Sequence, residues 1–291
     1  MTALTATRLA ALLLGAADRA LAQTAASAPR VFAITATATR FEAPAEVAAG
    51  PVTFTLVNRA RVAVEAQLLA VRDDHTPAEA IELLLAGQPR PDWIVAAGGV
   101  GPLAPGLRAG VTQSLPPGSY VVLSLLPDTA RVPQYRRGYI TGFRATGRGV
   151  LAREDSIVAE LNVGSRFQFL RISYRNGRRI SLGGRELSLA TPILRGERAL
   201  EVNIGQGQSH QIALVRMDSS VVLRHYVAWL AGGQRGRAPG RPWGGVAVTP
   251  PGRQVWIRAR LEPGTYWLLC TAPHGARRGF ETGEYTQFVV R

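Results

Sequence analysis

The stretch Leu261-Glu-Pro-Gly-Thr-Tyr-Trp-Leu-Leu-Cys270-Thr-Ala-Pro-His274 lies near the C-terminus and has a counterpart in the first half of the chain. The counterpart reads Leu115-Pro-Pro-Gly-Ser-Tyr-Val-Val-Leu-Ser124-Leu-Leu-Pro-Asp128. In each copy Pro-Gly marks a turn, and the apolar run after it is typical of a buried central strand. The second copy holds the chain's only cysteine and then a histidine, where the first copy has serine and aspartate.

Three further pairs of segments match in the same order, which indicates a tandem duplication. The segment Gln67–Arg72 pairs with Gln211–Arg216 at a spacing of 144 residues, whereas the pair containing Ser124 and Cys270 has a spacing of 146. The other pairs are Pro44–Asn58 with Thr191–Asn203, and Ala78–Gly87 with Leu223–Gly232. In this alignment His210 lies opposite Ala66.

Each copy is predicted to consist of short strands with one short helix. Val52–Val57 and Val255–Leu261 alternate apolar and polar residues, as half-buried strands do. Thr76 and Glu79 form a capping box at the start of an amphipathic segment in the first copy. We therefore predict an all-β protein of two tandem β-sandwich domains, each with one inserted helix. The predicted ranges are 30–146 for the first domain, 147–184 for a linker or added strands, and 185–291 for the second domain.

The N-terminus predicts export. Residues 1–22 read as a signal peptide, with Arg8 before the apolar run Leu9–Ala17 and a cleavage motif ending at Ala22. No other segment is long and apolar enough to span a bilayer. The expected location of the mature protein is therefore the periplasm or the extracellular space.

The glycine and proline content favours many turns, and the positive net charge favours binding to an acidic partner surface. The chain has 31 glycines and 19 prolines among 291 residues, and its formal net charge is +14 with every basic residue an arginine. Such a charge attracts an acidic surface or polymer at long range. No nucleic-acid recognition motif is present, so nucleic acid is not an expected partner. A single cysteine excludes an internal disulfide and suggests a metal ligand, an intermolecular bond or a buried thiol.

Three side chains suited to a soft metal occur together in the second copy. His210, Cys270 and His274 stand where the first copy has Ala66, Ser124 and Asp128. Two imidazoles and one thiolate form a trigonal set that suits copper in both oxidation states. The predicted metal ligands are therefore His210, Cys270 and His274, for one copper ion.

At these residues the chain resembles the cupredoxins, the superfamily of blue (type 1) copper proteins. The resemblance covers about Thr191 to Arg291 for the site and extends to the first copy for the fold alone. It implies Greek-key β-sandwiches, a copper ion held by His210, Cys270 and His274, and transfer of single electrons to a partner protein whose identity the sequence does not specify.

The chain departs from the family pattern at the fourth ligand, because no methionine follows His274. Aligning Arg278-Gly279-Phe280 with Arg137-Gly138-Tyr139 places Phe280 near the usual position of the methionine. A phenylalanine does not bind metal. The open alternatives are a three-coordinate copper, a fourth ligand from Glu281 or a backbone carbonyl, or a decayed site.

Two other functions compete with an electron carrier. The first is a metal-free tandem β-sandwich that serves as a cell-envelope binding or interaction module. The second is a Cys-His hydrolase, but no orienting acid or oxyanion-stabilising feature accompanies Cys270 and His274, so the chain is not expected to be an enzyme.

Overall fold

The computed structural model describes eight ranges of the chain: 29–147, 169–175, 178–182, 195–204, 207–218, 223–232, 236–282 and 284–291. The predicted signal peptide 1–22 lies outside these ranges, as do residues 148–168 of the predicted linker. Within the described residues, no helix has the length and apolar character needed to cross a membrane.

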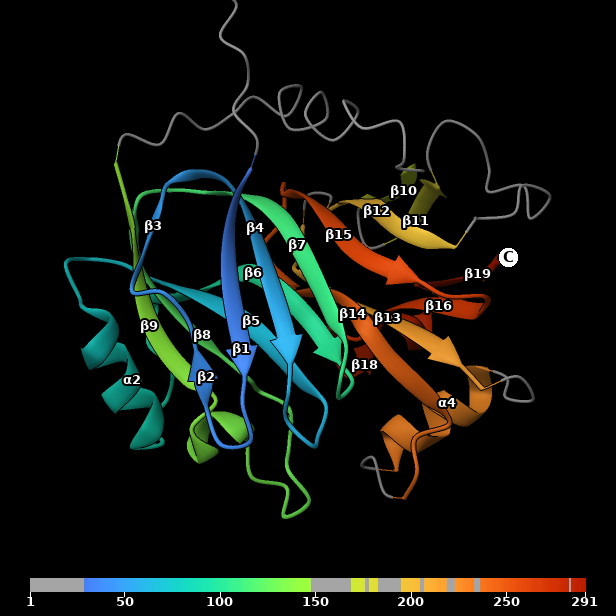
Figure 1. Ribbon diagram of the computed structural model, residues 1–291, viewed down its shortest axis with the longest axis horizontal. Coiled ribbons are helices and arrows are strands. Elements are labelled where there is room, and N and C mark those ends of the chain that lie inside the picture. Colours follow the sequence, from blue (N-terminus) through green and yellow to red (C-terminus); the bar gives the residue numbers. More distant parts are fainter. Residues whose placement is uncertain are drawn as a thin grey trace, which may run out of the picture.

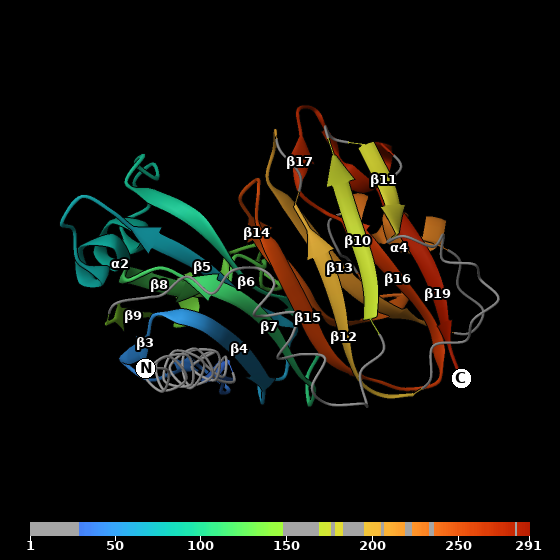
Figure 2. The ribbon, with the colours of Figure 1, turned by 90° about the horizontal axis from the view of Figure 1, so that it is seen from above.

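Two large sheets pack face to face around a shared core (Figures 1 and 2). The first sheet has eight strands, in the order β11 (Arg178–Leu182), β10 (Phe169–Arg175), β12 (Gly196–Asn203), β15 (Gln254–Leu261), β7 (Arg108–Leu115), β4 (Gly50–Asn58), β1 (Arg30–Ala36) and β2 (Phe41–Glu42). The second sheet has nine, in the order β19 (Tyr285–Val290), β16 (Gly264–Cys270), β13 (His210–Met217), β14 (Gly240–Thr249), β6 (Ile94–Leu103), β5 (Val64–Val71), β8 (Gly118–Leu123), β9 (Ile140–Thr146) and β3 (Glu46–Ala48). The predicted all-β sandwich class is confirmed.

The two halves of the chain repeat the same structure at a spacing of 146 residues. Gly99 and Gly245 both have a positive φ, and a Cβ atom on either would lie about 2 Å from a carbonyl oxygen of the neighbouring strand, at Ala66 and at Ile212 respectively. Ala66 and Ile212 are therefore equivalent, and the same spacing relates Ser124 to Cys270. We call residues 29–147 the first repeat and the described residues from 195 onward the second repeat.

This equivalence corrects the sequence alignment around His210. Gln67 is equivalent to Ala213 rather than to Gln211, and the residue equivalent to His210 is Val64 rather than Ala66. The paired strands bear this out, because Val64 lies opposite Leu103 and His210 lies opposite Thr249. A shift of two residues was not visible in the sequence, because side chains alternate with a period of two along a strand and the shift preserves the pattern.

Both sheets continue from one repeat into the other (Figure 2). β7 pairs antiparallel with β15, with Val111 opposite Ile257, and β6 pairs with β14, with Val100 opposite Val246. Each of these pairs joins equivalent residues, so the repeats are related by an approximate two-fold axis. The edges that would end each sandwich are thereby paired with each other, and one continuous core contains residues from both repeats.

One short helix covers the outer face of the second sheet in each repeat, as predicted. Helix α2 (Pro77–Leu85) packs over Leu69 and Val121, and its capping box at Thr76 and Glu79 is present. Helix α4 (Leu223–Ala231) lies at the equivalent position and contributes Tyr226 to the apolar cluster of the second repeat. The 3-10 helices η1 (Gln134–Arg137) and η2 (Gly279–Thr282) complete the repeated pattern.

Candidate metal centre

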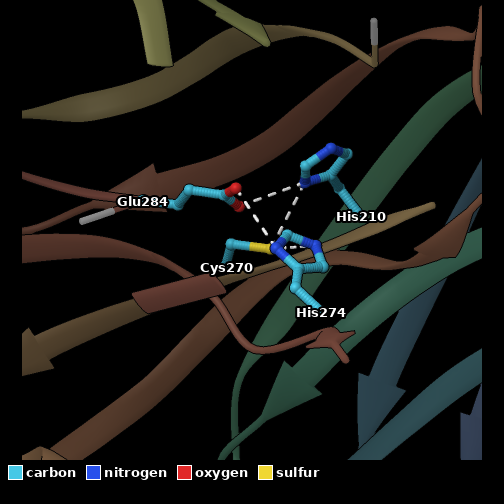
Figure 3. A group of neighbouring side chains, drawn as sticks. All are labelled: His210, Cys270, His274 and Glu284. Carbon is cyan, nitrogen blue, oxygen red and sulfur yellow. Dashed lines mark hydrogen bonds and ion pairs between the residues drawn. The ribbon is translucent and has the colours of Figure 1, made fainter. Parts of the chain in front are cut away.

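The second sheet brings the predicted ligands of the second repeat together. His210 is the first residue of β13 and Cys270 is the last residue of the neighbouring strand β16, which is paired so that Ile212 faces Cys270. His274 follows in the two-residue strand β17 (Pro273–His274), which pairs with β18 (Arg277–Arg278). All three predicted ligands therefore converge at one end of the sandwich (Figure 3).

A fourth side chain, that of Glu284, completes the group. Glu284 lies between η2 and β19, and its carbonyl oxygen accepts a hydrogen bond from the Cys270 amide at 2.9 Å. This bond sets the backbone of Glu284 beside the end of β16, so that the carboxylate points toward the sulfur and both imidazoles (Figure 3).

The four groups have the spacing of a metal site. His210 Nδ1 lies 3.4 Å from Cys270 Sγ, and Sγ lies 3.9 Å from His274 Nε2. Glu284 Oε2 lies 3.2 Å from His210 Nδ1, and Glu284 Oε1 lies 3.2 Å from His274 Nδ1. Ligand atoms that surround one ion tetrahedrally at ordinary metal–ligand distances are separated by roughly 3.3–3.8 Å. Cys270 and Glu284 face different nitrogens of the His274 ring. One ligand atom from each of the four residues lies within 4.8 Å of all the others, so the group could hold a metal ion.

Burial sets the protonation of the group. Burial raises the pKa of the Cys270 thiol to about 12, so the thiol keeps its proton until a metal displaces it. Burial also lowers the pKa of His210. Glu284 acts in the opposite direction and raises this pKa, whereas His274 lowers it further by a smaller amount. The neutral imidazole is the form that binds metal. The side chain of His274 is 8% exposed against 2% for His210, so His274 provides the edge of the centre that is nearest to solvent.

Two features of the site fit a bound cation. Both carboxylate oxygens of Glu284 are buried, and each lies 3.2 Å from an imidazole nitrogen of His210 or His274. A buried carboxylate requires compensation by positive charge, which a protonated imidazole or a bound cation supplies. Gly279 allows the thiol and the carboxylate to approach each other closely, because a Cβ atom at this position would lie 2.5 Å from Cys270 Sγ and 2.5 Å from Glu284 Oε2.

The first repeat fills the equivalent space with a side chain. Gln134 N donates to Leu126 O, just as Gly279 N donates to Ala272 O in the second repeat, so the two positions correspond. The Gln134 side chain is buried, accepts a hydrogen bond from Ser124 Oγ at 2.8 Å and donates to Ala63 O at 2.9 Å. The predicted contrast between the repeats therefore has a structural basis, since an amide occupies in one repeat the space that glycine leaves open in the other.

The remaining equivalent positions of the first repeat do not offer the same ligands. Val64, which corresponds to His210, is fully buried. Asp128 corresponds to His274, but its carboxylate accepts hydrogen bonds from the Ala130 and Val132 amides and contacts Arg137. Asp128 therefore stabilises a turn.

The fourth ligand position differs from both residues considered in the sequence. Phe280 is buried in the apolar cluster beneath α4, and the Glu281 carboxylate is exposed and accepts the Arg278 amide at 2.6 Å. The sequence alignment of Gly279-Phe280 with Gly138-Tyr139 was wrong by four residues. The amides of Ser124 and Cys270 donate to Tyr139 O and Glu284 O respectively, so Glu284 is equivalent to Tyr139. A spacing of 145 residues relates Glu284 to Tyr139, which is not a carboxylate, so the spacing alone does not identify Glu284 as a member of the group.

Among known proteins, this chain is similar to solved structures but matches no family profile and no curated sequence. Auracyanin B is 16% identical with a TM-score of 0.30, covering 43% of this chain and 88% of its own. Auracyanin A, a "blue" copper protein from Chloroflexus aurantiacus, is 16% identical with a TM-score of 0.29, covering 40% of this chain and 99% of its own. The Cu-containing nitrite reductase of Thermus scotoductus is 12% identical with a TM-score of 0.26, covering 91% of this chain and 62% of its own.

All of these TM-scores lie below 0.5, so the similarities decide neither the fold nor the chemistry of this chain. The chemistry of the centre rests on its own residues. The fold and the site together give a tandem β-sandwich with a His/Cys/His/Glu group in the second repeat.

Proposed function

We propose that this protein binds one copper ion through His210, Cys270, His274 and Glu284 and carries single electrons. The observation that carries the proposal is the convergence of two imidazoles, one thiol and one buried carboxylate, two of which pack closely against Gly279. Thiolate and imidazole ligands select copper or zinc over harder cations.

The protein's part in electron transfer is to hold the ligands still. A copper ion bound here would supply the Cu(II)/Cu(I) couple. His210 and Cys270 lie on paired strands of the continuous second sheet, so neither ligand can move without disturbing that sheet. The small hairpin β17–β18 carries His274 at the solvent side, where its imidazole edge offers the shortest route between the centre and a partner.

Glu284 would distinguish this centre from one with a neutral fourth ligand. A carboxylate adds a negative charge in a buried site, and that charge stabilises Cu(II) more than Cu(I) because the divalent ion carries the larger charge. We therefore expect a low reduction potential. A tetrahedral set of nitrogen, sulfur and oxygen ligands also suits zinc, which carries no electrons.

The test is to add Cu(II) and, separately, Zn(II) to the purified protein and to its Cys270→Ser variant. The expected result is one copper per chain and an intense visible thiolate-to-copper band in the wild type, with no band in Cys270→Ser. His225→Gln, at an exposed histidine of α4, serves as the matched control and should retain the band. A wild type that stays colourless and takes up no copper would contradict the proposal and favour a metal-free interaction module. Stable uptake of zinc with rejection of copper would contradict electron transfer.

Export and an acidic partner complete the proposal. The predicted signal peptide 1–22 supports delivery to the periplasm or the cell exterior, and mass spectrometry of the mature protein should then find Gln23 at its N-terminus.

The net charge of +14, with exposed Arg277 and Arg278 beside His274, favours a redox partner with an acidic docking face. Raising the ionic strength should therefore slow electron transfer to an acidic acceptor protein.

A further inference from the structure

Glu65 is a buried carboxylate at the contact between the two repeats. The residue is only 2% exposed. One carboxylate oxygen accepts the Leu125 amide at 3.2 Å, and the other accepts the side-chain amide of Gln211 at 3.0 Å. The metal centre described above does not include Glu65, although Gln211 belongs to the second repeat and is the neighbour of a ligand.

Gln211 connects Glu65 to the strands that carry two ligands. It directly follows His210 in β13, and its carbonyl oxygen accepts the amide of Thr271 at 2.9 Å. Thr271 in turn directly follows Cys270. The backbone of Gln211 therefore holds the ends of β13 and β16 together at the ligands, while its side chain is held by Glu65 from the other repeat.

The filled site of the first repeat fixes Glu65 from the opposite side. The Glu65 amide donates to Ser124 Oγ at 3.4 Å, and this hydroxyl donates to the buried Gln134 side chain. Gln134 is also held by Ala63 O. A continuous set of buried hydrogen bonds thus runs from the filled site of the first repeat to the ligand strands of the second.

We propose that Glu65 is a positioning residue of the copper centre, through which the first repeat holds the ligand strands at Gln211 and tunes the reduction potential. The inference rests on the proposed copper function. It assigns to the first repeat, which lacks metal ligands at the equivalent positions, a role in setting the properties of the second.

The charge of Glu65 gives this role a measurable signature. Burial raises the pKa of the Glu65 carboxyl to about 7, so its charge changes near neutral pH. The groups that face it from neighbouring elements, the Leu125 and Gln211 amides and the Ser124 hydroxyl, are neutral. The nearest titratable side chains along those elements are His210 and Asp128, and the latter contacts Arg137. Because an ionised carboxylate favours Cu(II), the reduction potential should fall as the pH rises from 6 to 8.

The experiment compares the wild type with Glu65→Gln, Gln211→Met and the control Glu42→Gln, whose carboxylate is exposed and pairs with Arg40. We expect Glu65→Gln to retain one copper and to abolish the fall in potential between pH 6 and 8. Gln211→Met keeps the carboxylate and loses a donor that lowers its pKa, so the midpoint of the fall should move to higher pH. Glu42→Gln should behave as the wild type.

A second readout uses the metal-free protein. The Glu65→Gln and wild-type proteins should differ in how their free energy of unfolding depends on pH between 5 and 8, which establishes that Glu65 titrates in this range. Copper-loaded Glu65→Gln with the same potential–pH curve and the same copper spectrum as the wild type would overturn the inference while leaving the copper function intact. Absence of copper from every variant, wild type included, would instead overturn the proposed function and this inference with it.

Discussion

At the scale of one residue, Gly279 distinguishes the His/Cys/His/Glu group of the second repeat from the equivalent position of the first. In the second repeat this position has no side chain, and the sulfur of Cys270 and the carboxylate of Glu284 face the space. In the first repeat Gln134 fills the equivalent space and bonds Ser124. The two sites therefore differ in volume as well as in ligand chemistry.

Gly279→Ala tests this view directly. The added Cβ would lie 2.5 Å from both Cys270 Sγ and Glu284 Oε2, so the ligand atoms must separate. We expect copper binding to weaken at least about tenfold, which corresponds to about 1.4 kcal/mol. Competition with a copper chelator measures the affinity, and Ala276→Ser, at an exposed position of the preceding hairpin β17–β18, is the control. Unchanged affinity in Gly279→Ala would mean that copper binds elsewhere.

Glu284→Gln tests the role of the carboxylate while keeping its size. Loss of the negative charge should destabilise Cu(II) relative to Cu(I), so the reduction potential should rise and Cu(II) affinity should fall by about tenfold or more. Voltammetry and chelator competition on the same samples measure the two quantities. A potential equal to that of the wild type would show that Glu284 does not contact the ion.

Three of the four residues of the centre were predictable from the sequence because their chemistry is unusual in this chain. Cys270 is its only cysteine, and His210 and His274 are two of its four histidines. Glu284 is one of 20 acidic residues, and its role depends on a backbone hydrogen bond to Cys270 that no local motif indicates. Its burial, which makes it chemically significant, results from tertiary packing.

At the scale of elements, strand and helix types were predictable and strand register was not. The capping box at Thr76 and the alternation in Val255–Leu261 both correspond to observed elements. The pairing of Gln67 with Gln211 failed because a strand shifted by two residues keeps the same face toward the core. Only the close backbone contacts at Gly99 and Gly245 fix the register.

The contact between β5 and β13 through Glu65 and Gln211 predicts a pH-dependent stability. The pKa of Glu65 is raised by burial from 4.5 to about 7, so the folded state favours the protonated form. This stabilisation is fully present below pH 4.5 and is lost as the pH rises through 7, a change of about 3 kcal/mol for this one group.

Denaturant unfolding of the metal-free protein at pH 5 and pH 8 measures this effect. Between pH 5 and pH 8, the free energy of unfolding of the wild type should fall relative to that of Glu65→Gln, by somewhat less than about 3 kcal/mol. Parallel stabilities of the two proteins at both pH values would show that Glu65 does not titrate in this range.

At the scale of the whole molecule, the two repeats form one structure. The sequence predicts two tandem sandwiches, but the pairing of β7 with β15 and of β6 with β14 makes both sheets continuous. This continuity was not predictable, because the strands that meet at the two-fold axis have the same apolar alternation as strands paired within a repeat.

Ile257→Ala probes the shared core, because Ile257 is fully buried and faces Val111 across the axis. We expect a loss of about 2–5 kcal/mol of stability and a single unfolding transition in which both repeats take part. Hydrogen exchange followed by mass spectrometry compares β5 with β13, and both should lose protection together. Protection that persists in β5 while β13 exchanges would mean that the repeats unfold independently.

The central claim is that one copper ion lies among His210, Cys270, His274 and Glu284. An anomalous difference map at the copper absorption edge, from crystals grown with equimolar Cu(II), locates the ion without reference to its function. The account predicts one strong peak at roughly 2.0–2.3 Å from a nitrogen of each histidine and from the sulfur, with a Glu284 oxygen in contact. A peak at another group of residues, or no peak in crystals shown to contain folded protein with a reduced cysteine, would contradict it.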